Sequence, residues 1–520
     1  MLWGMATSGR GGAFKSNIEE KESTHRVLVL MDVFCDFHGL YLTDMARAVY
    51  GVRCVHVLSE YMANFFLSKE EERRKKLGVD EEFGDGMPPM PPLPPRMPSS
   101  PEEAIAWRRD LVEKLLEDQK SIGKNYKDVE IKGLICESDP GLDDAESLSS
   151  WLNVTNHNGF NEARRNKFMT ISTLASNGIP TVQQKLCNSV DEAEEFARDQ
   201  FSNCNADVVV VKPVRGCASD DVFLCRDIDS VRVAYEKIKG STVLGSPTQT
   251  HNSVLIQEYA AGQEYAIDTV SKNGKLKIAA VWKYDKRPQP PTVGQEPEAD
   301  DDENRKHRQV YYATKLYDDD VGSLHDEDAE PLLPMIYKYL DECLNALDIR
   351  WGITHSELII TADGPRLVEV NCRQHNMDFV PLTDHAVGYN LYELLLAAYF
   401  GDENDNEDDP DVDKDARVDW NLIPDFPSTR MNAAMIHLVN DKKGTLKRLN
   451  EDALYEIQSM QSVFDLQVYP DFLEPGVSVI EPTIDIKSDA GWIQMIHPNP
   501  EVFQRDYDRI MELMPTIFEV

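Results

Sequence analysis

Two acidic residues held opposite each other on a short hairpin constrain this chain more than any other feature of its sequence. The apolar runs Leu358–Thr361 and Leu367–Val370 flank an Asp-Gly turn at Asp363, and this pattern is typical of a β-hairpin. With Asp363 at the centre, Glu357 lies directly opposite Glu369, because each is six residues away. Directly opposed side chains have Cβ atoms about 4.5–5.5 Å apart, so the pattern predicts a close carboxylate pair.

The same face of the hairpin carries further polar side chains. Because alternate strand residues share a face, Glu369, Asn371 and Arg373 point the same way. Two close carboxylates repel each other unless something neutralises them, and Glu and Asn oxygens suit Mg²⁺ held together with nucleotide phosphates. Arginine offers a planar fork for phosphate or carboxylate. We therefore predict Glu357, Glu369 and Asn371 as metal ligands; the alternative is a polar strand face exposed to solvent.

Charge and cysteine content limit the classes of function. The chain of 520 residues has a net charge of -37, and so acidic a surface disfavours nucleic acid as a partner. No apolar run approaches the roughly 20 residues that cross a membrane, and the N-terminus lacks the apolar core of a secretory signal. The nine cysteines include no CxxC pair, which is typical of reduced thiols. We expect a cytoplasmic protein without nucleic-acid or membrane partners.

The order of apolar runs and turn signals predicts a multidomain α/β protein, and the length is sufficient for three or more domains. Proline-rich and acidic stretches indicate the boundaries. The predicted segments are a disordered lead-in (1–24), an N-terminal α/β domain (25–155) with a Pro-rich insert (87–101), a core in two parts (156–260 and 261–401), an acidic linker (402–427) and a small C-terminal α/β unit (428–520).

A second motif joins a buried strand to a loop of small residues. The strand ends in Lys212, and the loop after it contains Gly216 and Ser219. Such a strand can direct an ammonium group at phosphate, and small residues let backbone N–H groups approach phosphate oxygens. It is not a P-loop, because GxxxxGK[ST] is absent. The alternative is a lysine that reaches solvent from a strand end.

A third motif runs from Val254 to Asp268 and reads as a strand, a short linker and a second strand. The linker exposes backbone groups in apolar surroundings, and these groups can bind an adenine edge. Glu264 on the second strand can accept hydrogen bonds from ribose hydroxyls, although a solvated strand residue is the alternative. Asp268 is expected to satisfy local structure.

Taken in order, these motifs resemble the ATP-grasp superfamily: Lys167 on a helix before Gly178-Ile-Pro, the Lys212 loop, the Glu258–Glu264 hinge and the acidic hairpin. The segment that begins Gly141-Leu-Asp-Asp-Ala-Glu is most similar to the carboxylate–amine ligase branch, which includes L-amino acid (dipeptide) ligases and carnosine-synthase-like enzymes. The resemblance implies an N-terminal α/β domain, a two-lobed ATP-grasp core (lobe A, 156–260; lobe B, 261–401) and a small C-terminal α/β unit.

The resemblance also implies cofactors and roles. The expected cofactors are ATP and two Mg²⁺ ions, with Mn²⁺ as an alternative ion. Arg373, Glu369 and Asn371 would form the catalytic set, and Glu357, Glu369 and Asn371 would bind metal. The residues expected to contact ATP are Lys167, Lys212, Gly216 and Ser219 at the phosphates, Glu258, Tyr259, Ala260 and Ala261 at adenine, and Glu264 at the ribose. One departure is Asp220-Asp221, where the family commonly has glycine, since acid there could repel phosphate.

These roles imply an acid–amino-acid ligase that forms an amide bond through an acyl phosphate. A substrate carboxylate attacks the γ-phosphorus of ATP and releases ADP, and an amine then displaces phosphate. Catalysis is mostly positioning and electrostatics, so no Ser or Cys nucleophile is needed. The expected partners are small carboxylate and amine molecules, and homodimers are common in the family. Candidates for substrate binding are His375, Lys286 and Arg308, and His375 is also a candidate base.

Three other functions fit parts of the pattern. A biotin-dependent-carboxylase-like enzyme shares the fold but would use bicarbonate. A nucleotide-binding regulator would bind ATP without turnover, although the full set of Glu, Asn and Arg residues disfavours a decayed site. An interaction protein would use the acidic loops and the Pro-rich insert.

Overall fold

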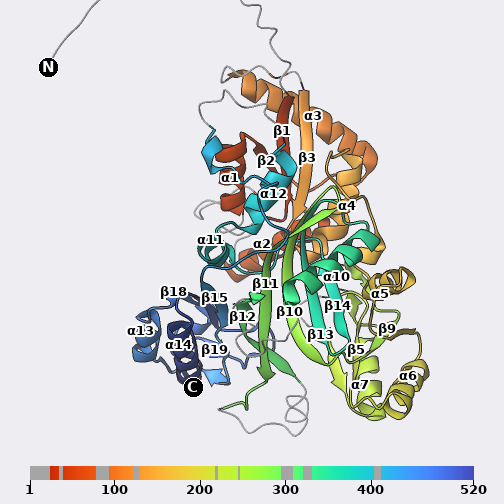
Figure 1. Ribbon diagram of the computed structural model, residues 1–520, viewed down its shortest axis with the longest axis vertical. Helices are drawn as coiled ribbons and strands as arrows, with labels where there is room; N and C mark the ends of the chain where they lie inside the picture. Colours follow the sequence, from red (N-terminus) through yellow and green to blue (C-terminus); the bar gives the residue numbers. More distant parts are fainter. Residues whose placement is uncertain are drawn as a thin grey trace, which may run out of the picture.

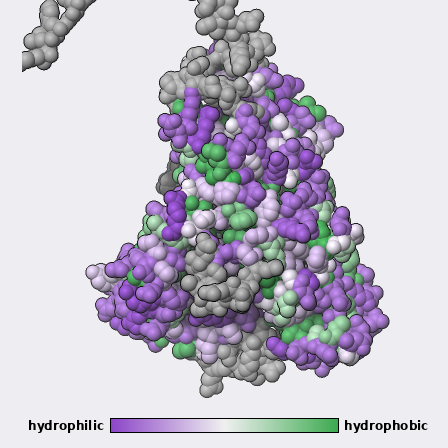
Figure 2. Space-filling view, viewed as in Figure 1, coloured by the Kyte–Doolittle hydropathy of each residue, from purple (hydrophilic) through white to green (hydrophobic). Residues whose placement is uncertain are grey.

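The computed structural model describes residues 24–33, 39–77, 93–121, 126, 128–216, 221–243, 246–293, 308–319, 331–402 and 412–520 (Figure 1). Most of the predicted lead-in, the first part of the Pro-rich insert, and Ser219 lie outside these residues. The face of the molecule shown in Figure 2 is mostly hydrophilic, with small scattered apolar areas. Among the helices that the structure describes, none is both long and apolar enough to cross a membrane.

The N-terminal part is built on a parallel sheet of three strands in the order β2-β1-β3. The central strand is buried along nearly its whole length, as expected for a parallel strand covered on both faces. The strands are β1 (Thr24–Met31), β2 (Arg53–Val57) and β3 (Asp128–Cys136). The helices are α1 (Tyr41–Tyr50), α2 (Glu60–Leu77), α3 (Pro101–Ser121) and α4 (Leu142–Trp151), with the 3-10 turn η2 (Asp139–Gly141) before α4.

The next part is an antiparallel sheet of four strands in the order β4-β9-β5-β6. Helices α6 and α7 pack on it through apolar side chains, which form a small core of their own. The strands are β4 (Gln184–Cys187), β5 (Val209–Pro213), β6 (Phe223–Cys225) and β9 (Val254–Glu258), beside the short pair β7 (Thr242–Val243) and β8 (Ser246–Thr250). The helices are α5 (Lys167–Ser176), α6 (Val190–Asn203) and α7 (Ile228–Ile238), preceded by η3 (Glu162–Arg164).

The largest element is an antiparallel sheet of eight strands in the order β14-β13-β10-β11-β12-β15-β20-β18, which crosses the centre of the molecule in Figure 1. Its strands are β10 (Gly262–Lys272), β11 (Lys275–Pro288), β12 (Gln309–Leu316), β13 (Gly352–Thr361), β14 (Gly364–Asn371), β15 (Asn432–His437), β18 (Val463–Val468) and β20 (Gly491–His497). The last three come from the predicted C-terminal unit, and β12 pairs with β15. That unit therefore continues the sheet of the core.

Helices cover this sheet, and one of them joins it to the N-terminal part. Helix α12 (Leu391–Phe400) buries all but two of its side chains, and it packs against β10 and α1, since an all-round apolar helix needs cover on every side. The other elements are α10 (Leu332–Ala346), α11 (Val380–Ala386), α13 (Glu451–Gln458), α14 (Pro500–Leu513), η5 (Lys414–Ala416), η6 (Pro470–Phe472), η7 (Met514–Thr516), β16 (Gly444–Thr445), β17 (Arg448–Leu449), β19 (Val479–Ile480) and β21 (Phe518–Glu519).

The hairpin of β13 and β14 has the predicted register at the acidic pair: Glu357 is directly opposite Glu369. The uniform hairpin assumed in the prediction is wrong, because Thr361 pairs with Gly364 and the turn is centred before Asp363. A bulge between Glu357 and Leu358 shifts the register by one residue and restores the predicted pairing. Bulges of this kind are frequent next to active sites, where they redirect side chains.

Candidate active site

The opposed carboxylates lie in a mostly buried setting. The side chain of Glu369 is 18% exposed and forms an ion pair with Lys167, and Asn371 Nδ2 donates a hydrogen bond to Glu369 Oε1 at 2.9 Å. Burial acts to raise the pKa of Glu369, but the charge and hydrogen bond of Lys167 outweigh it and hold this pKa well below its usual range. The carboxylate is therefore ionised at neutral pH.

Lys167 begins helix α5. The helix starts there because Asn166 caps it, with its side-chain oxygen accepting from Met169 N at 3.1 Å. Lys167 N donates to Val214 O at 3.0 Å, and Nζ donates to Gly216 O at 3.2 Å. The start of the predicted phosphate loop is thus tied to the first turn of α5. Ser219 of that loop falls outside the described residues.

Lys212 lies near the end of β5, as predicted, and it is only 5% exposed. This burial contradicts the alternative of a lysine that reaches solvent. Burial first, and then the charge of Lys167, lower the pKa of Lys212 to about 8, while Glu369 and Glu357 act in the opposite direction. A buried ammonium close to carboxylates is suited to receive an anionic ligand.

Glu357 has its partners within the same sheet, one on its own strand β13 and one on β11. Tyr284 Oη donates to Glu357 Oε1 at 3.3 Å, and His355 Nε2 lies 3.6 Å from the same oxygen. Burial and Glu369 act to raise the pKa of Glu357, but the hydrogen bond and charge of His355 overcome them and lower it. His355 was not among the residues predicted for the site, although its place two residues before Glu357 puts it on the same strand face.

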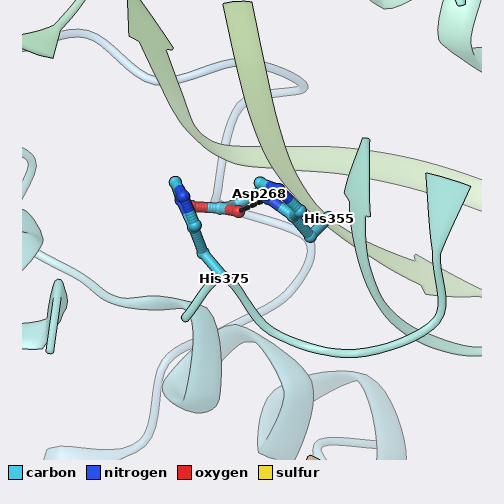
Figure 3. A group of neighbouring side chains, drawn as sticks. All are labelled: Asp268, His355 and His375. Atoms are coloured by element: carbon cyan, nitrogen blue, oxygen red, sulfur yellow. Dashed lines mark hydrogen bonds and ion pairs between the residues drawn. The ribbon is translucent and has the colours of Figure 1, made fainter. Parts of the chain in front are cut away.

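Behind Glu357, Asp268 lies between two imidazoles, those of His355 and His375 (Figure 3). Asp268 Oδ1 is 3.2 Å from His355 Nδ1, and Trp282 Nε1 donates to Oδ2 at 2.7 Å. The two imidazole rings stack with centroids 4.1 Å apart, and Phe379 stacks on the other side of His375. Asp268 thus serves local structure, as expected, and also reaches the candidate substrate residue His375.

The two histidines have opposite pKa shifts. Burial acts to lower the pKa of His355, but its hydrogen bonds to Asp268 and Glu357 raise it to about 9. For His375, burial and the nearby charge of His355 lower the pKa to about 4. At neutral pH the first imidazole is therefore cationic and the second is neutral.

Arg373 is held by a residue of the N-terminal part. Its Nε and Nη2 donate to the two carboxylate oxygens of Asp139 at 2.8 and 2.9 Å, and the two side chains are 5% and 9% exposed. Arg165 Nη1 approaches Asp139 at 3.4 Å and Asn371 Oδ1 at 3.1 Å. Burial acts to raise the pKa of Asp139, but Arg373 and then Arg165 lower it. Asp139 and Arg165 were not among the residues predicted for the site; the one signal in the sequence was the place of Arg165 two residues before Lys167.

Of the remaining predicted site residues, Glu264 and Lys286 lie in the site and Arg308 lies away from it. Glu264 is close to the carboxylate pair and accepts from Lys286 Nζ at 2.7 Å through both oxygens, so its expected ribose contact would require an exchange of partners. The charge of Glu264 overcomes burial and raises the pKa of Lys286. By contrast, Arg308 contacts Gln289 at 3.4 Å, beyond the far end of β11.

The predicted adenine segment, Glu258–Ala261, connects β9 to β10. Glu258 N is hydrogen-bonded to Gln183 O, and Tyr259 is 44% exposed. The segment therefore joins the four-stranded sheet to the eight-stranded sheet, and its role in binding adenine stays a prediction.

Comparison with known proteins defines the class of this fold. The model of the ATP-grasp domain matches residues 206–295. An L-amino acid ligase from Bacillus licheniformis superposes with a TM-score of 0.56 at 16% identity, over 94% of this chain and 98% of that one. An N5-carboxyaminoimidazole synthase from Aspergillus clavatus superposes with a TM-score of 0.53 at 12% identity, over 94% and 99%. The chain contains an ATP-grasp domain and has an ATP-grasp fold.

A similarity in sequence extends beyond that domain. The chain is 23% identical over 387 residues to dapdiamide A synthase of Enterobacter agglomerans. The aligned residues cover 74% of this chain and 79% of that protein. Together with the structural neighbours, this similarity confirms the resemblance to the carboxylate–amine ligase branch.

The donor set at the hairpin fits Mg²⁺. Glu357, Glu369 and Asn371 present carboxylate and amide oxygens from two adjacent strands, and oxygen donors of this kind are the ligands Mg²⁺ takes beside nucleotide phosphates. Lys167 and Arg165 now contact two of these side chains. A cation in this position would therefore take the place of ammonium and guanidinium groups.

Proposed function

We propose that this protein is an ATP-dependent carboxylate–amine ligase that forms an amide bond through an acyl phosphate and releases ADP and phosphate. The observation that carries the proposal is the opposed pair Glu357 and Glu369 beside Lys167 and Lys212. Arg373 follows two residues after the end of β14, the strand of Glu369. This set provides ligands for a metal bound to nucleotide phosphates and cations for the phosphates themselves.

The comparisons support the same reaction and favour amino acids as substrates. One similar protein is named as a dapdiamide synthase and another as an L-amino acid ligase. The Aspergillus clavatus synthase was solved in complex with ADP. An ATP site in this chain is therefore expected between the four-stranded sheet and the eight-stranded sheet, where Lys212 and Glu264 lie.

Mg²⁺ would be held by Glu357, Glu369 and Asn371. When bound, it would supply charge neutralisation at the β- and γ-phosphates. Lys167 would then exchange its carboxylate partner for a phosphate oxygen, so metal binding and phosphate binding are coupled through this side chain. Lys212 would face the same phosphates from the end of β5.

The substrate carboxylate would attack the γ-phosphorus, and Arg373 would stabilise the charge on the transferring phosphoryl group. The guanidinium is fixed in orientation by Asp139 through two hydrogen bonds. The acyl phosphate would then be attacked by the amine, which forms the amide and releases phosphate. Neutral His375 lies beside this region and contacts Tyr284 at 3.4 Å.

The test is product analysis with purified full-length protein, Mg²⁺ATP and pooled L-amino acids. We expect ADP and phosphate to appear in equal amounts and only when the pool is present. Release of AMP and pyrophosphate would contradict the acyl-phosphate mechanism. Turnover that depends on bicarbonate instead of amino acids would indicate the carboxylase-like alternative.

A further inference from the structure

A second group of ligand-type side chains lies behind the predicted magnesium ligands. Asp268 on β10, His355 on β13 and His375 in the segment between β14 and α11 each offer one ligand atom, and these atoms lie within 4.8 Å of one another. Their side chains are 5%, 4% and 12% exposed. Three elements thus bring two imidazoles and a carboxylate together in a mostly buried position (Figure 3).

The atoms that face inward are suited to a common ion. His355 Nδ1 lies 3.2 Å from Asp268 Oδ1, and His375 Nδ1 lies 3.6 Å from Oδ2. His375 Nδ1 is buried, and its contact with this carboxylate is longer than an ordinary hydrogen bond. An ion held by the carboxylate and this nitrogen would give both of them a closer partner.

The outward-facing atoms of the same three side chains have partners of their own. His355 Nε2 faces Glu357 at 3.6 Å, and His375 Nε2 faces Tyr284 Oη at 3.4 Å. Trp282 Nε1 donates to Asp268 at 2.7 Å. Ligating histidines almost always donate their second N–H to an oxygen, and ligating carboxylates are themselves hydrogen-bonded. The surroundings of this group match that pattern.

We propose that Asp268, His355 and His375 form a binding site for a transition-metal dication of the Zn²⁺ type, separate from the magnesium ligands. Two imidazoles with one carboxylate favour Zn²⁺, Co²⁺ or Fe²⁺, whereas Mg²⁺ prefers oxygen ligands throughout. On binding, the two rings turn so that both Nδ1 atoms meet the ion, and any proton on Nδ1 is released. His355 keeps its Nε2–H directed at Glu357.

The probe is Co²⁺, added to metal-free full-length protein without ATP or amino acids, in the presence of excess Mg²⁺ to fill the oxygen ligands. We expect about one Co²⁺ to bind per chain, with visible absorption bands of nitrogen ligation. The intrinsic fluorescence should fall as well, because Trp282 is hydrogen-bonded to Asp268. Binding does not depend on turnover, so this result is independent of the proposed ligase activity.

Variants assign the ion to its ligands. His375→Gln and, separately, Asp268→Asn should lose the absorption bands and weaken Co²⁺ binding by at least tenfold. His437→Gln is the matched control, because His437 is also buried beside an aspartate, Asp489, at 2.7 Å, but in the C-terminal part. It should bind Co²⁺ as the unaltered protein does, and so should Glu369→Gln.

Two results would overturn the proposal. One is unaltered protein that binds clearly less than one Co²⁺ per chain or shows no absorption bands of nitrogen ligation. The other is binding that survives in His375→Gln and Asp268→Asn but is lost in Glu369→Gln, because the ion would then belong to the magnesium ligands. Circular dichroism of each variant checks that the fold is intact, and the measurement on unaltered protein decides the question even if a variant fails to fold.

Discussion

Glu357 and Glu369 face each other on one hairpin, yet their charges are balanced by partners of different origin. Glu357 contacts Tyr284 and His355, which lie on strands β11 and β13 of its own sheet. Glu369 is paired with Lys167 at the start of α5, outside that sheet. One carboxylate is positioned within a single sheet, and the other depends on how separate parts of the chain pack together.

The difference separates a preformed half of the site from an assembled half. The preformed half continues through His355 to Asp268 and Trp282, all on adjacent strands. The assembled half continues from Asn371 through Arg165 to Asp139 in the N-terminal part, which also holds Arg373. Side chains on rigid elements keep their geometry, whereas contacts between parts of a chain can change when ligands bind.

The largest effect is expected where the two halves meet. Glu369→Gln removes a predicted metal ligand and the partner of Lys167, so turnover should fall by about 10³-fold or more. ADP release with Mg²⁺ATP measures the loss, and circular dichroism checks the fold. Asp363→Asn, an exposed carboxylate-to-amide change at the turn of the same hairpin, should keep full activity. Full activity in Glu369→Gln would contradict the assignment of Glu369 as a metal ligand.

The assembled half is tested by Asp139→Asn. The amide cannot accept both hydrogen bonds that Arg373 donates to the carboxylate of Asp139. Misplacement of a catalytic group by about 1 Å costs on the order of 10²-fold in rate. We expect kcat to fall more than the KM for ATP rises, with partial recovery in Asp139→Glu.

Asp143→Asn provides the comparison for Asp139→Asn. Asp143 also joins the N-terminal part to the phosphate loop, through Arg215 at 2.8 Å, but it does not contact Arg373. An equal loss of kcat in Asp143→Asn would assign the effect to packing of the parts and not to the orientation of Arg373.

The preformed half is tested by His355→Gln. The histidine stands behind a predicted metal ligand, and loss of such a supporting partner typically weakens metal binding by about 10–100-fold. The Mg²⁺ concentration for half-maximal turnover should rise by that factor while the fold stays intact. An unchanged Mg²⁺ requirement would mean that Glu357 is held without His355.

The lowered pKa of Lys212 predicts that ATP binding depends on pH. Its pKa of about 8 lies below the ordinary value for lysine, so the ammonium is present below pH 8 and is lost as pH rises above it. The affinity for Mg²⁺ATP, measured by calorimetry without amine, should be constant below pH 8 and fall by up to about tenfold per pH unit above it. Lys212→Arg should remove this decline, because arginine stays charged.

The smallest effect is expected from Arg215→Ala. Arg215 pairs with Asp143, and the two side chains are 30% and 35% exposed. Partly exposed pairs contribute about 0.2–1 kcal/mol, so the unfolding temperature should fall by no more than about 2–4 °C. Arg366→Ala, which removes contacts to backbone carbonyls at the hairpin turn, is the control. A larger fall for Arg215→Ala would show that the two parts depend on this pair.

The sequence was sufficient for features that depend on local periodicity. Alternation along a strand fixed which side chains share a face with Glu369, and turn chemistry placed Glu357 opposite it. Even there, the register was right only because a bulge compensated for a turn centred before Asp363. A run of valines likewise identified the buried strand that ends near Lys212.

Only the tertiary structure decided the partners of these residues. Asp139 is 234 positions from Arg373, and no local pattern relates the two. The pairing of Glu264 with Lys286, and that of Asp268 with His355, likewise follow from strand order in the sheet. Periodicity fixes the direction of a side chain because it depends on the backbone alone, whereas charge pairing depends on distances that only the folded chain sets.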